Sequence, residues 1–488
     1  MKNTTSPWLF SLVGILLICT TCARNPVSGK KQLNFMSESQ EISIGKESEP
    51  QILAEFGPYQ GNPALQKFLS DKGLAMVKVS HRPNLPFKFH LVDSPVVNAF
   101  AAPGGYVYFT RGIMAHFNNE AQFAGVLGHE IGHVTARHAA EQYTKSTLAQ
   151  VGLMAGMIAS SKFQQYGDFA NMGLQLLFLK FSRSNESQSD QLGVEYSSKI
   201  GYDAKEMDDF FLVLKRITAQ ATGGKPIPAF LSTHPDPGDR YTKVRQMAAA
   251  YQLKNKGTYK INRNEYLQML EGLVYGEDPR QGYVENNVFY HPELKFYFPV
   301  PRGYKTQNSP SQFAMSSPDE NAMMLLTVAG EKTLAAAASG FIQQYQLKLL
   351  DQQTSTINGI PVIIQMSEQV AQAEQGQATT AVRILTYYYQ HGGNIYKMHG
   401  LSEAPVFEKY RPDFTATFKG FAELKDGPKL NVKPEVIRIK TLSKDQTLSE
   451  ALKSFGISST RLEEFAILNG RLLTDVVKAG TMIKTAGK

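Results

Sequence analysis

The chain has 488 residues, which is too long for one ordinary domain, so two to four domains are expected. Its composition of 42% hydrophobic and 19% charged residues is typical of a folded protein and excludes a mainly disordered chain. The net charge of +8 is modest for this length, and no Lys/Arg-rich cluster is interleaved with aromatic residues. We therefore expect no nucleic-acid partner.

The N-terminus has the pattern of a secretory signal. Residues 8–18 are apolar but too short for a comfortable membrane span. The following residues 20–26 (TTCARNP) resemble a bacterial lipoprotein junction, in which Cys22 becomes the acylated N-terminal residue, although Thr21 stands where Gly or Ala is usual. Residues 1–22 are therefore predicted to be a signal peptide with a lipoprotein cysteine. An ordinary cleaved signal peptide is the alternative. Either way the mature chain has no cysteine pair and no disulfide.

The next part of the chain alternates between helical and extended patterns. Residues 25–32 (NPVSGKKQ) form a polar linker. The predicted elements are helices at residues 37–56 and 63–79, a strand at 87–91 and a two-stranded turn region at 98–109, which contains Gly104 and Gly105.

An H-E-x-x-H pattern follows at His129, Glu130 and His133. Residues four apart lie on one face of a helix, so both imidazoles can reach one ion at about 2.0–2.1 Å from each nitrogen. Glu130 lies beside that ion, where it can take a proton from a bound water. Asn119 is the expected N-cap, with Gln122 three residues later. The pattern favours zinc but needs a third ligand, and a buried helix that happens to carry two histidines is the alternative.

Three glycines, at positions 125, 128 and 132, lie in the same helical stretch. Each costs about 0.5–1 kcal/mol relative to Ala inside a helix. We expect a closely packed neighbouring element, or a substrate backbone, to offset this cost.

The third ligand is predicted farther along the chain. The run from residue 169 to 200 has the pattern of one long helix, and Glu186 and Asp190 lie four residues apart on it. One carboxylate can bind zinc while the other accepts a hydrogen bond from the second nitrogen of a ligand histidine. Without the upstream histidines, such a pair would be an ordinary solvated face.

Together with Ser232-Thr-His-Pro235 and Arg240, these two motifs resemble the HtpX-like and CAAX-prenyl-protease-like zinc metallopeptidases over roughly residues 25–275. The resemblance implies a mainly α, zincin-type (gluzincin) catalytic domain with a small β-sheet at residues 23–275. It implies one Zn²⁺ per chain, with the metal ligands His129, His133 and Glu186, the general base Glu130, and Asp190 as the residue that orients a ligand histidine.

The same resemblance places His234 and Arg240 at the rim of the active site. There His234 would either stabilise the oxyanion or occupy the metal in a resting form. It also places the strand at Asn98 and Ala99 beside the cleft, although a plain core hairpin is the alternative. Ser189 departs from the Ala common in relatives, and we expect no effect.

The two metal-binding helices are separated by an apolar run at residues 148–160, which we expect to be a helix beside the site. Residues 162–168 would form a loop, either a lid or a static connector. Helical patterns follow at 202–251 and 266–275, and the Gly- and charge-rich residues 276–282 indicate a boundary.

Residues 286–425 have strand-like runs at 289–298, 384–390 and 395–398 and a helix at 334–350, a layout that weakly resembles a PsbP/Mog-like α/β sandwich. Residues 435–486 follow a β-α-α-β order that resembles a LysM module, a fold that often binds peptidoglycan. A structural cap or a protein-binding surface is the alternative.

The sequence therefore predicts a multidomain zinc metalloendopeptidase of the bacterial cell envelope. We expect it on the periplasmic side, lipid-anchored, and at the outer membrane in preference to the inner one. Its expected substrates are misfolded or assembling envelope proteins, with peptidoglycan as a further partner. The alternatives are an envelope chaperone or peptidoglycan-binding protein with a mostly silent protease domain, and a soluble secreted enzyme.

Overall fold

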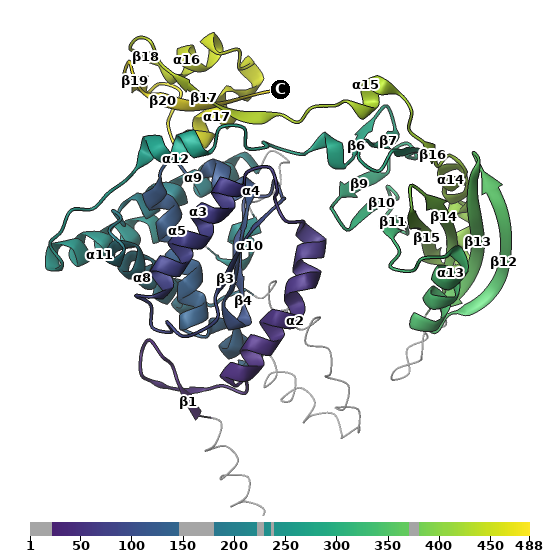
Figure 1. Ribbon diagram of the computed structural model, residues 1–488, viewed down its shortest axis with the longest axis horizontal. Coiled ribbons are helices and arrows are strands. Elements are labelled where there is room, and N and C mark those ends of the chain that lie inside the picture. Colours follow the sequence, from purple (N-terminus) through teal and green to yellow (C-terminus); the bar gives the residue numbers. More distant parts are fainter. Residues whose placement is uncertain (1–21, 146–179, 222–228, 236–238, 370–379) are drawn as a thin grey trace, which may run out of the picture. The chain divides into compact units, whose positions relative to one another are not determined.

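The computed structural model describes residues 22–145, 180–221, 229–235, 239–369 and 380–488. The chain divides into two compact units (Figure 1). The first comprises the chain up to Leu53, Gly57–Gly276 and Val436–Gly487, and the second is mainly Glu277–Glu435. The segments expected at 148–160 and 162–168 lie outside the described residues. No helix in the described part of the chain is both long and apolar enough to cross a bilayer.

The first unit begins with a structured hairpin. β1 (Cys22–Arg24) pairs antiparallel with β2 (Lys31–Leu33). Of the predicted polar linker at residues 25–32, residues 25–30 form the turn of this hairpin and the last two belong to β2. Asn25 forms the turn, because its backbone accepts from Gly29 and donates to Lys30 while its side chain accepts from two further amides.

The helices and strands expected next are confirmed. They are α2 (Glu38–Phe56), α3 (Pro63–Val77), β3 (Lys88–Val92), β4 (Ala99–Ala102) and β5 (Tyr106–Thr110). β5 lies between the other two strands, parallel to β3 and antiparallel to β4. The turn between β4 and β5 depends on Gly104, whose φ of 80° lies in the left-handed region that favours glycine.

The two helices of the metal motifs follow. α4 (Arg111–His116) leads into α5 (Glu120–Thr135), and α8 (Arg183–Lys199) packs against α5. The predicted start of the second helix at residue 169 is wrong for its described part, because residues 180–182 are not helical. Ser182 is the N-cap and forms a capping box with Asn185, which fixes the start at Arg183.

Four further helices are described in this part of the first unit: α9 (Glu206–Ala221), α10 (Ala229–Thr233), α11 (Arg240–Lys254) and α12 (Arg263–Met269). The helix predicted at 266–275 starts and ends earlier than expected. Gly272 and Leu273 form backbone hydrogen bonds with Ile437 instead, which stops the helix.

The C-terminal residues have the predicted β-α-α-β order. β17 (Val436–Thr441) pairs antiparallel with β20 (Met482–Gly487), and α16 (Leu448–Ser454) and α17 (Leu462–Leu468) lie between them in sequence. The short strands β18 (Gln446–Thr447) and β19 (Val476–Val477) also pair. Hydrophobic residues of this module share one core with the rest of the first unit. The LysM resemblance and the domain boundaries remain predictions.

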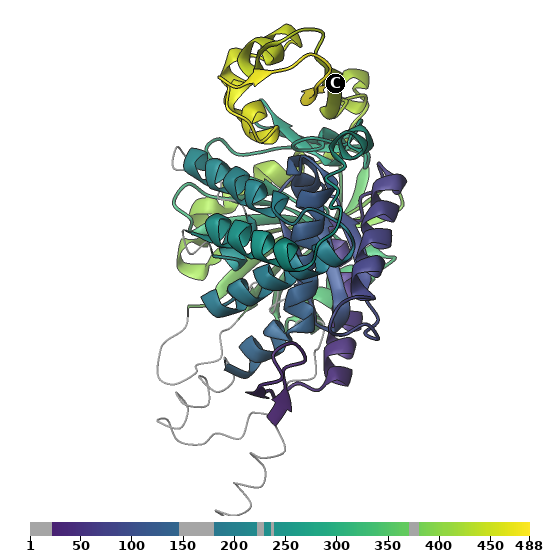
Figure 2. The ribbon, with the colours of Figure 1, turned by 90° about the vertical axis from the view of Figure 1, so that its left-hand side faces the viewer.

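The module is joined to α4 by a buried lysine. The Lys484 Nζ donates to the Ala115 and Phe117 carbonyl oxygens at 2.7 and 2.9 Å, and Lys484 is fully buried. Those carbonyls lie just before α5, so the C-terminal module contacts the start of the metal helix. Figures 1 and 2 show the module and the β1–β2 hairpin at opposite ends of the first unit.

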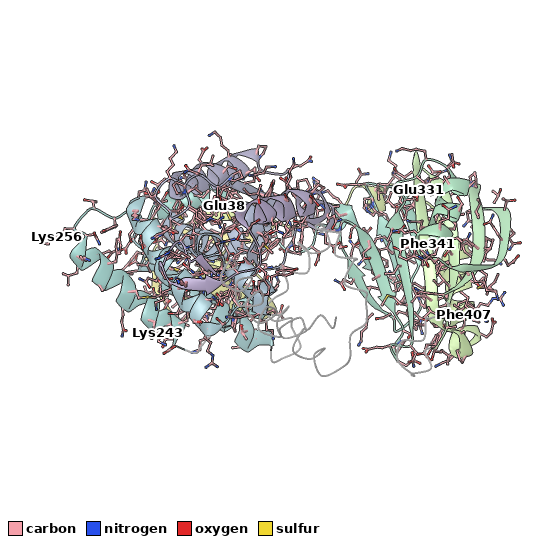
Figure 3. All side chains as sticks on the ribbon, turned by 90° about the horizontal axis from the view of Figure 1, so that it is seen from below. Glu38, Lys243, Lys256, Glu331, Phe341 and Phe407 are labelled. Carbon is pink, nitrogen blue, oxygen red and sulfur yellow. The ribbon has the colours of Figure 1, made fainter. Side chains whose placement is uncertain are left out.

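The second unit is a sheet with helices on both faces. The strand order is β12 (Lys348–Ile357), β13 (Ile360–Gln369), β14 (Val382–His391), β15 (Asn394–Glu403), β11 (Ala322–Val328), β10 (Gln312–Ser316) and β9 (Lys305–Asn308). Alternate residues of β13, β14 and β15 contact α13 (Leu334–Gln344) on one face and α14 (Phe407–Lys419) on the other. Phe341 of α13 stacks on His399 at 4.4 Å between ring centroids. Figure 3 labels Phe341 of α13 and Phe407 of α14 in this unit.

A smaller sheet has the order β16 (Ala422–Glu423), β8 (Phe296–Pro299), β7 (Val288–His291) and β6 (Tyr283–Glu285). The single strand predicted at 289–298 is therefore wrong. Pro292 has no N–H for a ladder and Lys295 has a φ of 56°, so the chain turns back there as a hairpin. The helix predicted at 334–350 ends at Gln344, before β12.

Candidate metal centre

Helix α5 brings His129 and His133 together. The Asn119 side chain accepts from the Gln122 backbone N–H at 2.8 Å and starts the helix where the sequence predicts. The two histidines then lie on one face, with their Nε2 atoms 3.0 Å apart, and both are buried. Two nitrogens in this position can share one ion.

The three glycines of α5 allow close packing against neighbouring helices. A Cβ at Gly128 would lie 3.0 Å from the Gly193 backbone of α8, and one at Gly132 would lie 3.1 Å from Leu192 Cβ. At Gly125 the close neighbour is Met207 of α9, at 2.7 Å. Helices α8 and α9 therefore pack closely against the glycines of α5. A closely packed neighbouring element, rather than a substrate backbone, accounts for these glycines.

Because α8 packs so closely, Glu186 reaches the histidine pair. Its Oε1 lies 3.4 Å from His133 Nε2, and its Oε2 lies 3.7 Å from His129 Nε2. The carboxyl group is 1% exposed. The structure thus brings the three predicted ligands together from two helices.

His234, just after α10, joins the same cluster. Ligand atoms of His129, His133, Glu186 and His234 all lie within 4.8 Å of one another. The His234 Nδ1 lies 3.0 Å from Glu186 Oε1 and 3.4 Å from His129 Nε2, and its ring stacks on Phe230 at 4.5 Å. The structure places His234 among the ligands, deeper than the rim position that the sequence predicted.

Asp190 and Arg240 lie behind the ligands. The Asp190 Oδ1 is 3.0 Å from His129 Nδ1, the nitrogen that faces away from the cluster. Arg240 is 2% exposed and pairs with both carboxylates, at 2.7 Å from Asp190 Oδ1 and 3.0 Å from Glu186 Oε2. This arrangement suits residues that hold the ligands in position.

Sequence reasoning missed His138. Its Nδ1 lies 3.0 Å from His133 Nδ1 and 3.2 Å from Ser189 Oγ, and its Nε2 lies 2.9 Å from Gln188 Oε1. Burial lowers the pKa of His138 to about 4, so the ring is neutral and can carry one donor and one acceptor nitrogen. His138 therefore supports His133 much as Asp190 supports His129. Its position five residues after His133 was the available signal.

Glu130 differs from the other buried side chains of the cluster because its carboxylate accepts no hydrogen bond in the described structure. It is 1% exposed, and within the described part of the chain neither carboxylate oxygen has a hydrogen-bond partner. The nearest basic group is His234 Nε2, at 3.7 Å from Glu130 Oε1. Burial raises the pKa of Glu130. An unpartnered buried carboxylate is costly, and a metal site with its water is a physical reason to retain one.

The protonation states suit metal binding. Burial lowers the pKa of His133 well below its ordinary value, so its imidazole is neutral. Burial alone would raise the pKa of Glu186, but the His234 and Arg240 charges outweigh it and hold this pKa well below the ordinary range. Neutral imidazole and ionised carboxylate are the forms that bind metals. This donor set, beside the unpartnered Glu130, fits Zn²⁺.

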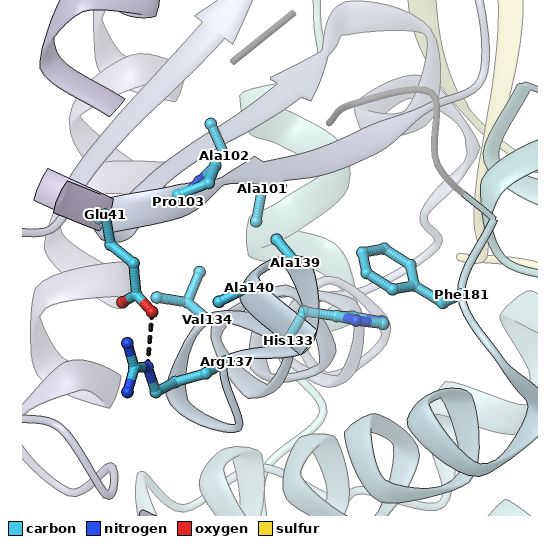
Figure 4. A pocket seen from close by; sticks show the side chains of 11 residues that line it. Glu41, Ala101, Ala102, Pro103, His133, Val134, Arg137, Ala139, Ala140 and Phe181 are labelled. Carbon is cyan, nitrogen blue, oxygen red and sulfur yellow. Dashed lines mark hydrogen bonds and ion pairs between the residues drawn. The ribbon is translucent and has the colours of Figure 1, made fainter. Parts of the chain in front are cut away.

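A recess of about 300 Å³ lies beside His133 (Figure 4). It is lined mainly by small apolar residues of β4, the following turn and the segment after α5, and Phe181 and the Glu41–Arg137 ion pair also line it. Of β4, Ala101 and Ala102 line the recess, whereas the predicted cleft residues Asn98 and Ala99 do not.

Two histidines one helical turn apart, a carboxylate from a second helix and a neighbouring glutamate without a hydrogen-bond partner among the described residues have the residue types and arrangement of a zinc metallopeptidase site. Comparison with known families agrees with this class. The model of peptidase family M48 matches residues 63–248, a stretch that contains all of these side chains.

Individual relatives resemble about half of the chain. The beta-barrel assembly-enhancing protease of Escherichia coli K12 is 29% identical over 231 residues, which cover 46% of this chain and 47% of that protein. The protein of the same name from Yersinia pestis is 30% identical over 252 residues, half of each chain. The mitochondrial metalloendopeptidase OMA1 of Arabidopsis thaliana is 31% identical over 188 residues, 38% of this chain and 36% of that one. The match thus spans about half the length of these bacterial relatives or less.

Among solved structures, the solution structure of cyanobacterial PsbP from Synechocystis sp. PCC 6803 is similar over 29% of this chain and 91% of that chain. The sequence identity is 12% and the TM-score is 0.23, a level of similarity from which we draw no conclusion.

Proposed function

We propose that this protein is a zinc-dependent metalloendopeptidase that hydrolyses peptide bonds of cell-envelope proteins. The observation that carries the proposal is the convergence of His129, His133 and Glu186 from two helices beside the unpartnered carboxylate of Glu130. His129, His133 and Glu186 would hold the ion.

Zinc, when bound, supplies Lewis acidity that makes a water acidic near neutral pH and polarises a carbonyl oxygen. Glu130 would accept the proton of the attacking water and return it to the leaving amide nitrogen. Asp190 holds the His129 tautomer by accepting from Nδ1, and Arg240 holds Asp190 and Glu186 in place through its two ion pairs. His138, whose Nδ1 lies 3.0 Å from His133 Nδ1, would hold the tautomer and orientation of His133 in the same way as Asp190 does for His129.

His234 has two candidate roles. As a fourth ligand it would keep the enzyme in a resting form until substrate displaces it, and its position within the cluster, with Nδ1 3.4 Å from His129 Nε2, favours this role. Burial alone would lower the pKa of His234, but the Glu186 and Glu130 charges outweigh it and raise this pKa, so the ring would release a proton when it binds the ion. As a donor it would stabilise the oxyanion that forms when water attacks the peptide. Proteolysis by His234→Ala separates the two, because loss of a resting ligand raises the initial rate whereas loss of an oxyanion donor lowers it.

Substrate class and location are supported by the relatives. Two of them are named for enhancing beta-barrel assembly, and we propose misfolded or assembling envelope proteins as substrates here as well. The sequence at residues 20–26 supports acylation of Cys22 and therefore a periplasmic location on a membrane, the outer one in preference. The C-terminal module is proposed to contact peptidoglycan.

The test is cleavage of casein by the purified chain from Ala23 onward, with and without a chelator. The proposal expects cleavage that stops when the metal is removed and returns with added Zn²⁺. Absent or chelator-insensitive cleavage would instead favour a chaperone or peptidoglycan-binding protein with a silent zinc domain.

A further inference from the structure

We propose that the β1–β2 hairpin is a membrane-contact surface that holds the metal site close to an anionic phospholipid bilayer. This inference rests on the proposed anchor at Cys22. It adds an orientation of the first unit on the membrane. The C-terminal end of α5, which bears the recess, would face the lipid, and the C-terminal module would lie on the side away from the lipid.

The first observation is that the hairpin is joined to the C-terminal end of α5. Asn25 is 7% exposed, and its Nδ2 donates to the Ala136 carbonyl at 3.0 Å. Its Oδ1 accepts from the Val27 and Ser28 amides at 2.9 and 3.0 Å. Both ends of this side chain are therefore used to fix the turn on the helix that carries His129 and His133.

The chain after the hairpin continues along the same end of α5. The Phe35 N–H donates to Thr144 Oγ1 at 3.0 Å, and Arg137 Nη2 donates to the Met36 carbonyl at 2.6 Å. Arg137 also pairs with the buried Glu41 at 2.5 Å, and Arg82 pairs with Glu41 at 2.9 Å. The segment that would leave the membrane is thus bound to the catalytic domain over many residues, which a flexible tether would not be.

These contacts limit how far the metal site can lie from the anchor. Asn25 lies three positions after Cys22, at most about 10 Å of extended chain. Ala136 likewise lies three positions after His133, about 4.5 Å along a helix. With the Asn25 side chain included, His133 lies on the order of 20 Å from the acylated residue.

The second observation is charge. Arg24, Lys30 and Lys31 are all exposed on the hairpin, and residues 23–37 contain no acidic side chain. Basic residues next to a lipid anchor are attracted to anionic headgroups. Each one raises the membrane partition coefficient about five-fold, so the three residues together raise it about 100-fold. The hairpin therefore fits an anionic bilayer surface.

The third observation is the position of the recess and of the C-terminal module along α5. Glu41 and Arg137, which join the N-terminal segment to α5, also line the recess beside His133. Lys484 of the C-terminal module binds the carbonyls that precede the other end of this helix, about 24 Å away. With the hairpin on the bilayer, the recess receives polypeptide presented at the lipid surface, and the module faces the aqueous side.

The experiment uses the full acylated chain in vesicles of phosphatidylethanolamine and phosphatidylglycerol. The chain has two cysteines, Cys19 in the signal and the acylated Cys22, so an introduced cysteine is the only free thiol of the mature protein. A fluorophore is attached at Ser39→Cys, at the exposed start of α2, or at Leu472→Cys, in the C-terminal module and 55% exposed. A lipid-headgroup quencher should quench the first label several-fold more than the second. Equal quenching, or the reverse order, would overturn the orientation.

Charge and anchor are tested separately. Replacing Arg24, Lys30 and Lys31 by Gln should lower the quenching at position 39, as should neutral phosphatidylcholine vesicles, whereas replacing the exposed Lys440, Lys444 and Lys453 by Gln should not. Unchanged quenching in the hairpin variant overturns the basic contact surface. Mass spectrometry of the mature N-terminus determines whether Cys22 is acylated. An acylated Cys22 with an unquenched position 39 refutes only the orientation, and an unacylated Cys22 refutes the anchor together with the inference that rests on it.

Discussion

Replacing Glu130 with Gln should make the metal-free protein more stable while it removes the activity. The wild-type carboxylate is 1% exposed and neither oxygen has a hydrogen-bond partner in the described structure. Such a group costs on the order of 1–3 kcal/mol, and more when it is charged. Because Gln keeps the shape and an uncharged polar group but removes the charge, we expect the free energy of unfolding to rise by about 1.4 kcal/mol for each pH unit between 4.5 and the raised pKa of Glu130. Proteolysis should fall about 10²–10⁴-fold, the usual contribution of a general base.

The pH dependence of the stability difference follows from the pKa of Glu130. Burial raises this pKa above the ordinary 4.5, so between 4.5 and the raised value the folded protein binds more protons than the unfolded chain. The contribution of Glu130 to the stability of the wild type therefore falls as pH rises through this range, and Glu130→Gln lacks this contribution. The advantage of the variant should grow with pH above 4.5.

The assay is urea unfolding of both metal-free proteins over a pH series, together with casein cleavage by the zinc-loaded proteins. Glu195→Gln is a matched control, because Glu195 lies on α8 and pairs with Lys199 at the surface at 2.7 Å. It should change stability by less than about 1 kcal/mol and leave cleavage unchanged. A less stable Glu130→Gln, or one that cleaves at the wild-type rate, would refute the reasoning.

Three further predictions concern the metal and its supports. Zinc at about 100 times its dissociation constant should stabilise the metal-free protein by about 2.7 kcal/mol, seen as a higher melting temperature, and an unchanged melting temperature would contradict the site. Asp190→Asn should weaken zinc binding about 10–100-fold in competition with a chelating dye, because His129 Nδ1 loses its carboxylate, and unchanged affinity would exclude this role. Lys484→Met should remove a pH-dependent part of the stability. Burial holds the pKa of Lys484 well below 10.5, so the unfolded chain binds more protons and wild-type stability should rise with pH between the two values. Urea unfolding at neutral and alkaline pH that shows the same slope for both proteins would contradict it.

The sequence predicted the parts of the site that depend on local pattern. The N-cap at Asn119 and the four-residue spacings of His129 with His133 and of Glu186 with Asp190 follow from helix geometry alone, and the structure has all three. The glycines of α5 also predicted close packing, although they could not identify α8 and α9 as the neighbours.

The other parts of the site and fold depend on contacts between residues far apart in the sequence, or on backbone angles that the residue type does not indicate. His138 reaches His133 because Arg137 adopts a left-handed φ of 61°, an uncommon conformation for Arg that no residue pattern indicates. Asn25 and Lys484 bind carbonyls more than one hundred and more than three hundred residues away, at the two ends of α5. Local residue patterns cannot contain these long-range bonds, so the sequence predicts the N-terminal segment and the C-terminal module without the contacts that join them to α5.

The central claim is that two helices hold one zinc ion through His129, His133 and Glu186. Anomalous scattering at the zinc edge from crystals of the zinc-loaded protein tests it most directly. The account predicts one peak per chain between α5 and α8, about 2.0–2.1 Å from one nitrogen of each histidine and about 2.0–2.2 Å from a Glu186 oxygen. No peak there, or an ion bound by residues of only one of these helices, would contradict it.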